Sequence, residues 1–152
     1  MELDPDFNEF VQLLLDNDVR FMIIGGYALA AHGVPRFTGD LDTWLWLHEE
    51  NVDRVMTVLE AFGFGSLNIN REDFLHPDRI IQLGYPPHRI DLLTNIDGVE
   101  FQDAWKRHVR FKVGDLEVPF ISREDLIANK KTVARPQDLV DAASLEEFPR
   151  IE

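Results

Sequence analysis

Two aspartates, Asp40 and Asp42, are the residues whose types and spacing most directly suggest chemistry. They lie in an apolar, tryptophan-rich stretch typical of a β-strand, in which successive side chains alternate between two faces. Both carboxylates therefore point to one face, and Leu41 points to the other. Two close carboxylates repel each other and are stabilised by a hard cation that prefers oxygen ligands, such as Mg²⁺. We interpret the pair as metal ligands; the alternative is two solvated acids on an edge strand.

A diglycine, Gly25-Gly26, ends the apolar run 21–24 and precedes a short alanine-rich segment. This order predicts a strand, a glycine turn and a short helix. Without Cβ atoms the backbone can be approached by a bulky group, and a helix N-terminus offers free N–H groups to an anion. The diglycine and the aspartate pair together predict a site for a metal-bound polyphosphate. A plain turn that needs positive φ is the simpler interpretation, and the two are compatible.

Thirteen residues separate the diglycine from the aspartate pair. This arrangement resembles the nucleotidyltransferase superfamily that includes DNA polymerase beta. The motifs GGYALAAHG and R-x-T-x-D-x-D, the latter from Arg36 to Asp42, are similar to motifs of the minimal bacterial members of this superfamily. These members are found in toxin–antitoxin and abortive-infection systems. The resemblance covers residues 21–91 well and the C-terminal third more loosely. It implies a nucleotidyltransferase-like fold and transfer of a nucleoside monophosphate from an NTP to a hydroxyl group.

The resemblance also implies a third carboxylate on a later strand, and Asp91 is the natural candidate. It lies within the alternating stretch 89–93, which predicts a second strand. If this strand neighbours the first, Asp40, Asp42 and Asp91 converge, and two Mg²⁺ ions about 4 Å apart can hold a triphosphate. Asp91 would then act as the base or as a ligand of the second ion. The alternative is a salt bridge to Arg89 on the same face.

Four further residues are candidates for contacts with the nucleotide phosphates. Arg36 and Thr38 precede the aspartates, where a guanidinium or hydroxyl group can meet phosphate oxygens. Lys130 and Lys131, with Arg135, form the clearest positive cluster in the chain, and a similar stretch occurs near the end of related proteins. A surface ion pair for Arg36 and favourable placement of the lysines at a helix C-terminus are the simpler interpretations.

Other prominent side chains receive structural interpretations. His32 precedes a glycine and is expected to end a helix. Asp138 and Asp141 share a helix face, where we expect a solvated or capping role. Trp44 and Trp46 are expected to pack in the core, although they could also wall the site or stack a base.

The order of the predicted elements indicates an α/β fold with a mixed β-sheet and helices mainly on one face. A turn is expected at 63–66, and a short helical segment is expected near 70–73. Helices are predicted at 5–17, 27–31, 49–62, 100–107, 122–133 and 136–148, and strands at 19–24, 40–47, 79–85, 88–94, 109–113 and 116–121. The strands 79–85 and 88–94 are expected to join through Pro86-Pro87.

Length and composition indicate one domain that spans residues 1–152 of a chain without cysteine. The chain shows no signal peptide, and its longest stretch without charged residues, at 21–35, is too short to span a membrane. These features indicate a cytoplasmic protein. The formal net charge of −13 disfavours sequence-independent binding to RNA or DNA and is compatible with a basic protein partner.

Two functions follow from these observations. The first is an Mg²⁺-dependent nucleotidyltransferase that acts on a protein side chain, an RNA end or a small molecule, with release of pyrophosphate. As an enzyme of this type the protein could be a toxin–antitoxin component with a toxin-like partner. The second is a catalytically inactive module of the same fold that binds a partner.

Overall fold

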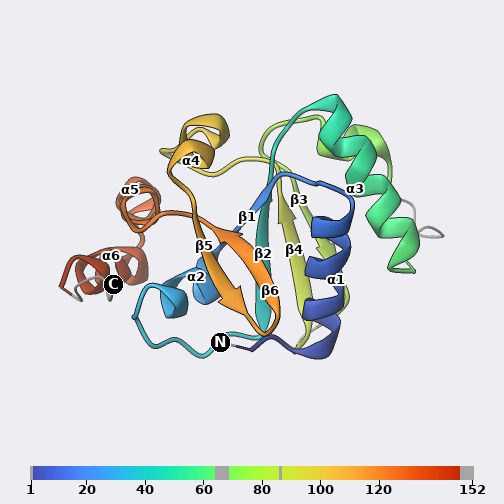
Figure 1. The fold of residues 1–152 in the computed structure, drawn as a ribbon. Coiled ribbons are helices and arrows are strands. Elements are labelled where there is room, and N and C mark those ends of the chain that lie inside the picture. The colour runs from blue at the N-terminus through green and yellow to red at the C-terminus, as the bar shows by residue number, and fades with distance from the viewer. Residues whose placement is uncertain (1, 64–68, 86, 148–152) are drawn as a thin grey trace.

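The computed structural model describes residues 2–63, 69–85 and 87–147, and the statements below refer to these residues. A six-stranded mixed sheet in the order β3-β4-β2-β1-β6-β5 forms the centre of the molecule (Figure 1). Its strands are β1 (Phe21–Ile24), β2 (Asp40–Leu45), β3 (Ile80–Leu83), β4 (Arg89–Leu93), β5 (Val109–Val113) and β6 (Leu116–Phe120). The helices are α1 (Pro5–Asp16), α2 (Gly25–Ala31), α3 (Glu49–Ala61), η1 (Arg71–Phe74), α4 (Phe101–Arg107), α5 (Arg123–Val133) and α6 (Pro136–Glu147).

The α/β fold class with a mixed sheet is confirmed, and the helices divide between the two sides of that sheet. In Figure 1, α1 and α3 stand on one side, and α5 and α6 stand together on the other. The core contains the apolar stripes of α1 and α3, which bury residues such as Phe10, Leu14, Val55 and Leu59. Burial of such side chains is the main favourable term in folding.

The predicted helices and strands all form, with ends that differ by a few residues. Asp4 caps α1 by accepting the backbone N–H of Asp6 at 2.9 Å, and Pro5 begins the helix. Most of the turn predicted at 63–66 lies outside the described residues. The same holds for Pro86 in the link from β3 to β4 and for Phe148 at the expected end of α6.

The central position of β2 is what places the candidate site. It pairs antiparallel with β1 and parallel with β4, so residues from three chain segments lie side by side. In the described part of the chain, no helix is long and apolar enough to cross a membrane.

Candidate active site

The parallel pairing of β2 with β4 sets three carboxylates beside one another. Asp42 lies opposite Asp91 in the register, and Asp40 lies opposite Arg89. Neighbouring strands are about 4.8 Å apart, and side chains at paired positions share a face. Asp40, Asp42 and Asp91 therefore meet on one face of the sheet, although β2 and β4 are separated in sequence by α3, η1 and β3.

Arg89 lies between two of these carboxylates and binds both. Its Nε donates to Oδ1 of Asp91 at 2.8 Å, and its Nη2 donates to Oδ2 of Asp91 at 3.1 Å. The same Nη2 donates to Oδ2 of Asp40 at 2.9 Å. The hydrogen bond with Asp91 is the main cause that raises the pKa of Arg89. The salt bridge between Asp91 and Arg89, which was the alternative interpretation of Asp91, is thus present. Arg89 forms a second salt bridge with Asp40.

Among the described residues, Asp42 forms no salt bridge with a cationic side chain, and its ionisation is strongly disfavoured. Burial, followed by the negative charges of Asp91 and Asp40 and a hydrogen bond with Asp91, raises the pKa of Asp42 to about 7. Arg89 lowers this pKa only in part. Close carboxylates that cannot all ionise together are characteristic of sites that hold a cation or a proton.

The donor chemistry of this group fits Mg²⁺, which prefers carboxylate oxygens and keeps several of its water ligands. A divalent ion would supply the positive charge that Asp42 lacks. Within the described residues, however, no group of three or more acidic, histidine or cysteine side chains is already arranged as a metal site. The salt bridges from Arg89 hold Asp40 and Asp91, so an ion would have to compete with its guanidinium group.

The diglycine packs directly against this group. Gly25 has a φ of +69°, and a Cβ atom at this position would lie 2.1 Å from Oδ2 of Asp42. A Cβ atom at Gly26 would lie 2.8 Å from Cβ of Thr38, which itself precedes the carboxylates. Thr38 fixes its own loop, because its hydroxyl donates to the carbonyl oxygen of Asp40 at 3.1 Å. The turn interpretation of Gly25 is confirmed by its positive φ, and the close approach of Asp42 excludes a side chain there. Phosphate binding at the diglycine stays a prediction.

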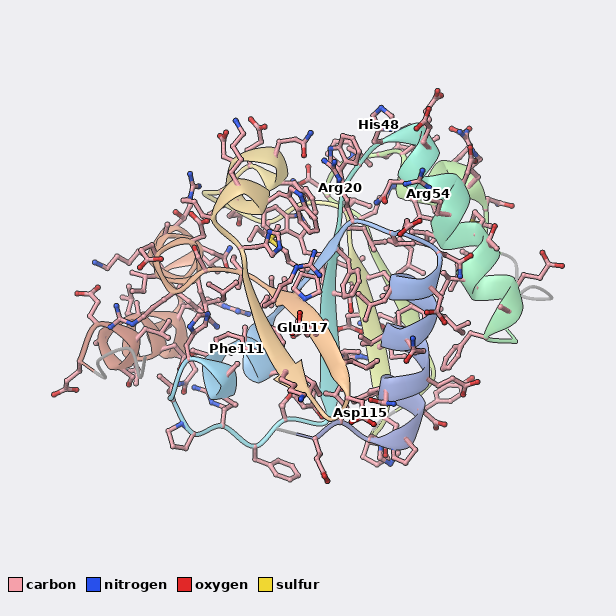
Figure 2. All side chains as sticks on the ribbon, in the orientation of Figure 1. Arg20, His48, Arg54, Phe111, Asp115 and Glu117 are labelled. Atoms are coloured by element: carbon pink, nitrogen blue, oxygen red, sulfur yellow. The ribbon has the colours of Figure 1, made fainter. Side chains whose placement is uncertain are left out.

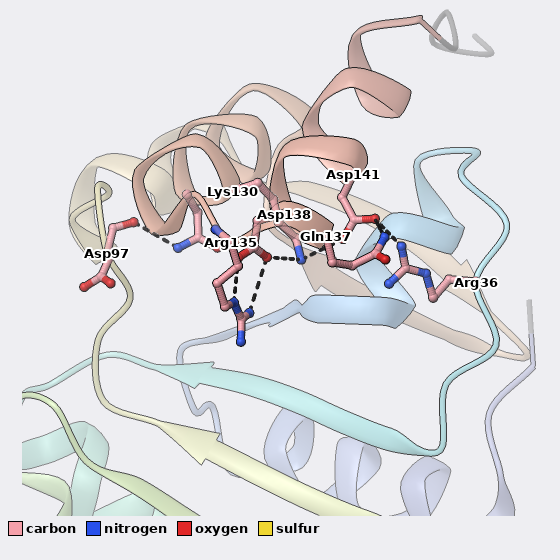
Figure 3. Close-up of polar contacts among 8 residues, drawn as sticks. Arg36, Asp97, Lys130, Arg135, Gln137, Asp138 and Asp141 are labelled. Carbon is pink, nitrogen blue, oxygen red and sulfur yellow. Dashed lines mark hydrogen bonds and ion pairs between the residues drawn. The ribbon is translucent and has the colours of Figure 1, made fainter.

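A buried ion network joins the loop before β2 to the C-terminal helices (Figure 3). Arg36 pairs with Asp141 on α6, which also accepts from Gln137 Nε2 at 2.9 Å. Lys130 on α5 lies 3.1 Å from Oδ2 of Asp141 and 3.3 Å from Oδ1 of Asp138. Arg36 therefore forms the expected ion pair, but its partner, Asp141, is buried instead of lying on the surface.

The expectation that Asp138 and Asp141 are solvated is wrong, because their exposed fractions are 2% and 1%. The capping interpretation holds for Asp138, whose Oδ2 accepts the backbone N–H of Arg135 at 3.2 Å. The hydrogen bond from the Arg135 side chain, aided by Lys130, lowers the pKa of Asp138 against the opposing effect of burial. A helix-face pattern alone does not reveal such burial, because it depends on how α5 packs on α6.

The two lysines predicted to contact phosphate have different environments. Lys130 is enclosed by the network, with 13% of its side chain exposed. The Lys131 side chain is 57% exposed and pairs with Glu146 on α6 at 2.6 Å. The structure thus separates them: Lys130 belongs to the network, and Lys131 belongs to the outer surface.

This difference gives a stability prediction. Lys130→Met keeps the aliphatic part of the side chain but removes one of the two cations beside each of the buried carboxylates of Asp138 and Asp141. We expect the free energy of unfolding to fall by about 2 kcal/mol, because Arg135 and Arg36 still compensate part of the charge. Lys131→Met removes only an exposed pair and should change it by less than about 0.5 kcal/mol. Urea denaturation of both variants makes the comparison. Equal losses would contradict the assignment of Lys130 to a buried network.

A cleft of about 350 Å³ lies near the carboxylates in the sheet, although none of the three carboxylates lines it. Two of its lining residues locate it: Ile24 lies opposite Asp42 in the register, and Leu93 lies two positions after Asp91. Arg79 and Arg135 also line this cleft. Sequence reasoning did not select either arginine as a site residue, although Arg135 belonged to the positive cluster; Arg79 has no motif that could have revealed it.

Two structural interpretations are confirmed. Trp44 is 1% exposed and packs edge-on against Phe101, with ring centroids 5.0 Å apart. His32 follows the last residue of α2, and its Nε2 lies 2.8 Å from the carbonyl oxygen of Ile121.

Comparison with solved structures shows which fold this chain has. TM1012 of Thermotoga maritima, assigned as a nucleotidyltransferase, has a TM-score of 0.60 at 16% identity, covering 93% of this chain and 88% of its own. The lincosamide antibiotic adenylyltransferase LnuA, solved with lincomycin, has a TM-score of 0.58 at 15% identity. The match covers 97% of this chain and 99% of the LnuA chain. ANT(2'')-Ia, solved with adenylyl-2''-tobramycin, has a TM-score of 0.54 at 13% identity. The match covers 91% of this chain and 84% of the ANT(2'')-Ia chain. The fold is therefore that of nucleotidyltransferases.

The family is identified by sequence. Residues 5–148 match the family described as nucleotidyl transferase of unknown function (DUF2204), and the chain belongs to this family. No curated protein matches the chain in sequence.

Proposed function

We propose that the protein is an Mg²⁺-dependent nucleotidyltransferase that transfers a nucleoside monophosphate from an NTP to an acceptor hydroxyl group. The convergence of Asp40, Asp42 and Asp91 beside the diglycine is the observation that carries this proposal. The family and the fold support the reaction class.

The three carboxylates are the groups that would hold Mg²⁺, and the metal would neutralise phosphate charge and lower the pKa of the acceptor hydroxyl. The acceptor oxygen attacks the α-phosphorus, the bond from that phosphorus to the bridging oxygen breaks, and pyrophosphate leaves. Asp91 takes the proton of the acceptor. Gly25 and Gly26 let the carboxylate of Asp42 and the side chain of Thr38 lie directly against the backbone at the start of α2, where the triphosphate would bind.

The cationic side chains divide into two roles in this proposal. Arg36 and Lys130 hold the loop before β2 against α5 and α6, so their effect on the phosphates acts through the position of this loop. Arg135 and Arg79 line the cleft itself. Lys131, with its exposed pair, has no part in binding the nucleotide.

The acceptor class follows from charge. A formal net charge of −13 favours a protein side chain or a cationic small molecule over an RNA end. LnuA and ANT(2'')-Ia, by their descriptions, modify small antibiotics, which supports a small-molecule acceptor. A toxin-like partner, modified by this chain as the antitoxin-like enzyme of a toxin–antitoxin pair, is one specific kind of protein acceptor.

A second candidate is a non-catalytic module that binds a partner. The salt bridges from Arg89 to Asp40 and Asp91 favour it, because they satisfy these carboxylates without a metal.

Label transfer distinguishes the two candidates. The purified protein is incubated with Mg²⁺ and each α-labelled NTP, with and without cell extract as a source of acceptors. We expect transfer that is lost with EDTA and in the variant that combines Asp40→Ala with Asp42→Ala. Asp115→Ala, a change at the exposed tip between β5 and β6, is the control that should keep activity. If no label is transferred from any NTP, or if transfer persists in the double variant, the enzyme proposal fails.

A further inference from the structure

Arg89 contacts the carboxylates of the candidate site, and the reaction proposed above gives it no role. It precedes Asp91 by two residues on β4 and lies opposite Asp40 in the register of β2 with β4. Its guanidinium group makes three hydrogen bonds, two with Asp91 and one with Asp40. Among the described residues, no other lysine or arginine forms a salt bridge with Asp40, Asp42 or Asp91. The three carboxylates are therefore accompanied by one fixed positive charge.

One nitrogen of this guanidinium group, Nη2, is shared by two carboxylates. It lies 2.9 Å from Oδ2 of Asp40 and 3.1 Å from Oδ2 of Asp91. Because Mg²⁺ binds oxygen ligands at about 2.1 Å, an ion that bridged these two oxygens would need the space that Nη2 fills. An arginine in a protein does not lose its proton, and its charge repels a metal ion. Arg89 thus blocks this bridging position as long as its salt bridges persist.

The other oxygens of the three carboxylates are open to a single ion. Asp42 follows Asp40 by two residues on β2 and lies opposite Asp91 on β4. Arg89 binds Oδ2 of Asp40 and does not bind its Oδ1. Asp40 and Asp42 can therefore offer oxygens to one ion while both salt bridges of Arg89 are kept.

The charges of these side chains lead to the same count of one ion. When all three carboxylates are ionised, Arg89 neutralises one of their charges, and a single divalent ion neutralises the other two. A second ion would add excess positive charge beside a guanidinium group that cannot be discharged. In sites with two metal ions, the ions lie about 4 Å apart and clamp the reacting phosphate between them. In this protein a guanidinium group stands where two of the carboxylates could otherwise share a second ion.

We propose that the carboxylates hold one divalent ion, and that the guanidinium group of Arg89 takes the place of the second of the two ions expected from the sequence. Of the three carboxylates, Asp40 and Asp42 hold the ion. Arg89 is a positioning residue that fixes the carboxylate of Asp91, which is left to take the proton of the acceptor. This inference rests on the proposed function and deepens it, because it separates the metal ligands from the base.

Electron paramagnetic resonance with Mn²⁺, which accepts the same oxygen ligands as Mg²⁺, counts the bound ions without requiring transfer. Two Mn²⁺ ions that share a carboxylate are spin-coupled and give a spectrum distinct from that of a single bound ion. The protein is titrated with Mn²⁺ alone and, in excess over the nucleotide, with NTPs whose α–β bridge is a methylene group, which blocks transfer. We expect the wild-type protein to bind one ion per chain in both states and to show no coupled spectrum.

Replacement of Arg89 tests whether its charge excludes the second ion. Arg89→Gln removes the charge and should bind a second Mn²⁺ ion with a coupled spectrum, whereas Arg89→Lys keeps the charge and should bind only one. Arg54→Gln removes an exposed guanidinium group from α3 (Figure 2) and is the control that should match wild type. A folded Arg89→Gln variant that still bound one ion would overturn the inference. A coupled pair of ions in wild type would overturn it even if Arg89→Gln failed to fold.

The same measurements separate the failure of this inference from the failure of the proposed function. A coupled pair of ions in wild type would refute the role of Arg89 and leave the proposed reaction intact. One bound ion without label transfer from any NTP would support the role of Arg89 and refute only the reaction. A wild-type protein that bound no Mn²⁺ in either state would refute both.

Discussion

Replacement of Asp42 by asparagine is expected to stabilise the fold and to abolish nucleotidyl transfer. Burial and two neighbouring carboxylates raise the pKa of Asp42 from 3.8 to about 7, so the charged form is disfavoured in the folded protein. Asparagine has nearly the same shape and carries no charge. Loss of this proposed Mg²⁺ ligand should lower the transfer rate by about three orders of magnitude or more.

The stability gain of Asp42→Asn depends on pH in a defined direction. Between pH 3.8 and about 7 the folded protein binds a proton at Asp42 that the unfolded chain releases. The contribution of this group to stability is therefore present at low pH and is lost as the pH rises through 7. The full difference corresponds to about 4 kcal/mol. Without divalent cations, we expect Asp42→Asn to unfold at higher denaturant concentration than wild type at pH 8 and at nearly the same concentration at pH 4.

Denaturation curves in EDTA at several pH values measure this effect. Asp115→Asn is the matched control, because it removes a carboxylate from the exposed tip between β5 and β6 and should leave the difference from wild type independent of pH. A variant of Asp42 that is less stable than wild type at pH 8 would show that the carboxylate is satisfied in its charged form. The electrostatic argument for a cation site would then be lost.

The elements of this fold could be predicted from local pattern, whereas their pairing could not. The apolar stripe of α1, with Phe7, Phe10 and Leu14, depends only on helical spacing, and all three residues are buried as expected. The shared face of Asp40 and Asp42 follows in the same way from strand geometry. That Asp91 lies next to Asp42 depends on the parallel pairing of β2 and β4. Spacing in the sequence does not determine such a pairing.

The partners of charged residues were the least predictable part of the site. Nothing in the sequence distinguishes Lys130 from its neighbour Lys131. In the structure Lys130 is enclosed between α5 and α6, whereas Lys131 pairs with Glu146 of α6 at the exposed surface. Asp141 and Arg36 are far apart in the chain and pair because α6 packs beside the loop that precedes β2. Such pairs follow from helix packing and have no local signature.

Replacement of Gly25 by alanine is expected to destabilise the fold and to remove activity, and Gly33 provides a matched control. Both glycines have positive φ, +69° at Gly25 and +96° at Gly33, so alanine is strained at either position by about 1 kcal/mol. Their surroundings differ: a Cβ atom at Gly33 meets nothing within 4 Å, whereas at Gly25 it would lie 2.1 Å from Oδ2 of Asp42.

Only Gly25→Ala must therefore displace the carboxylate of Asp42 or the start of α2. We expect Gly33→Ala to lower the free energy of unfolding by about 1 kcal/mol and Gly25→Ala by about 3 kcal/mol or more. Transfer activity under conditions where each variant is folded should persist in Gly33→Ala and disappear in Gly25→Ala, because Asp42, a proposed metal ligand, moves. Equal losses of stability would mean that backbone strain alone explains the need for glycine. The close approach of the diglycine to the carboxylates would then have no energetic consequence.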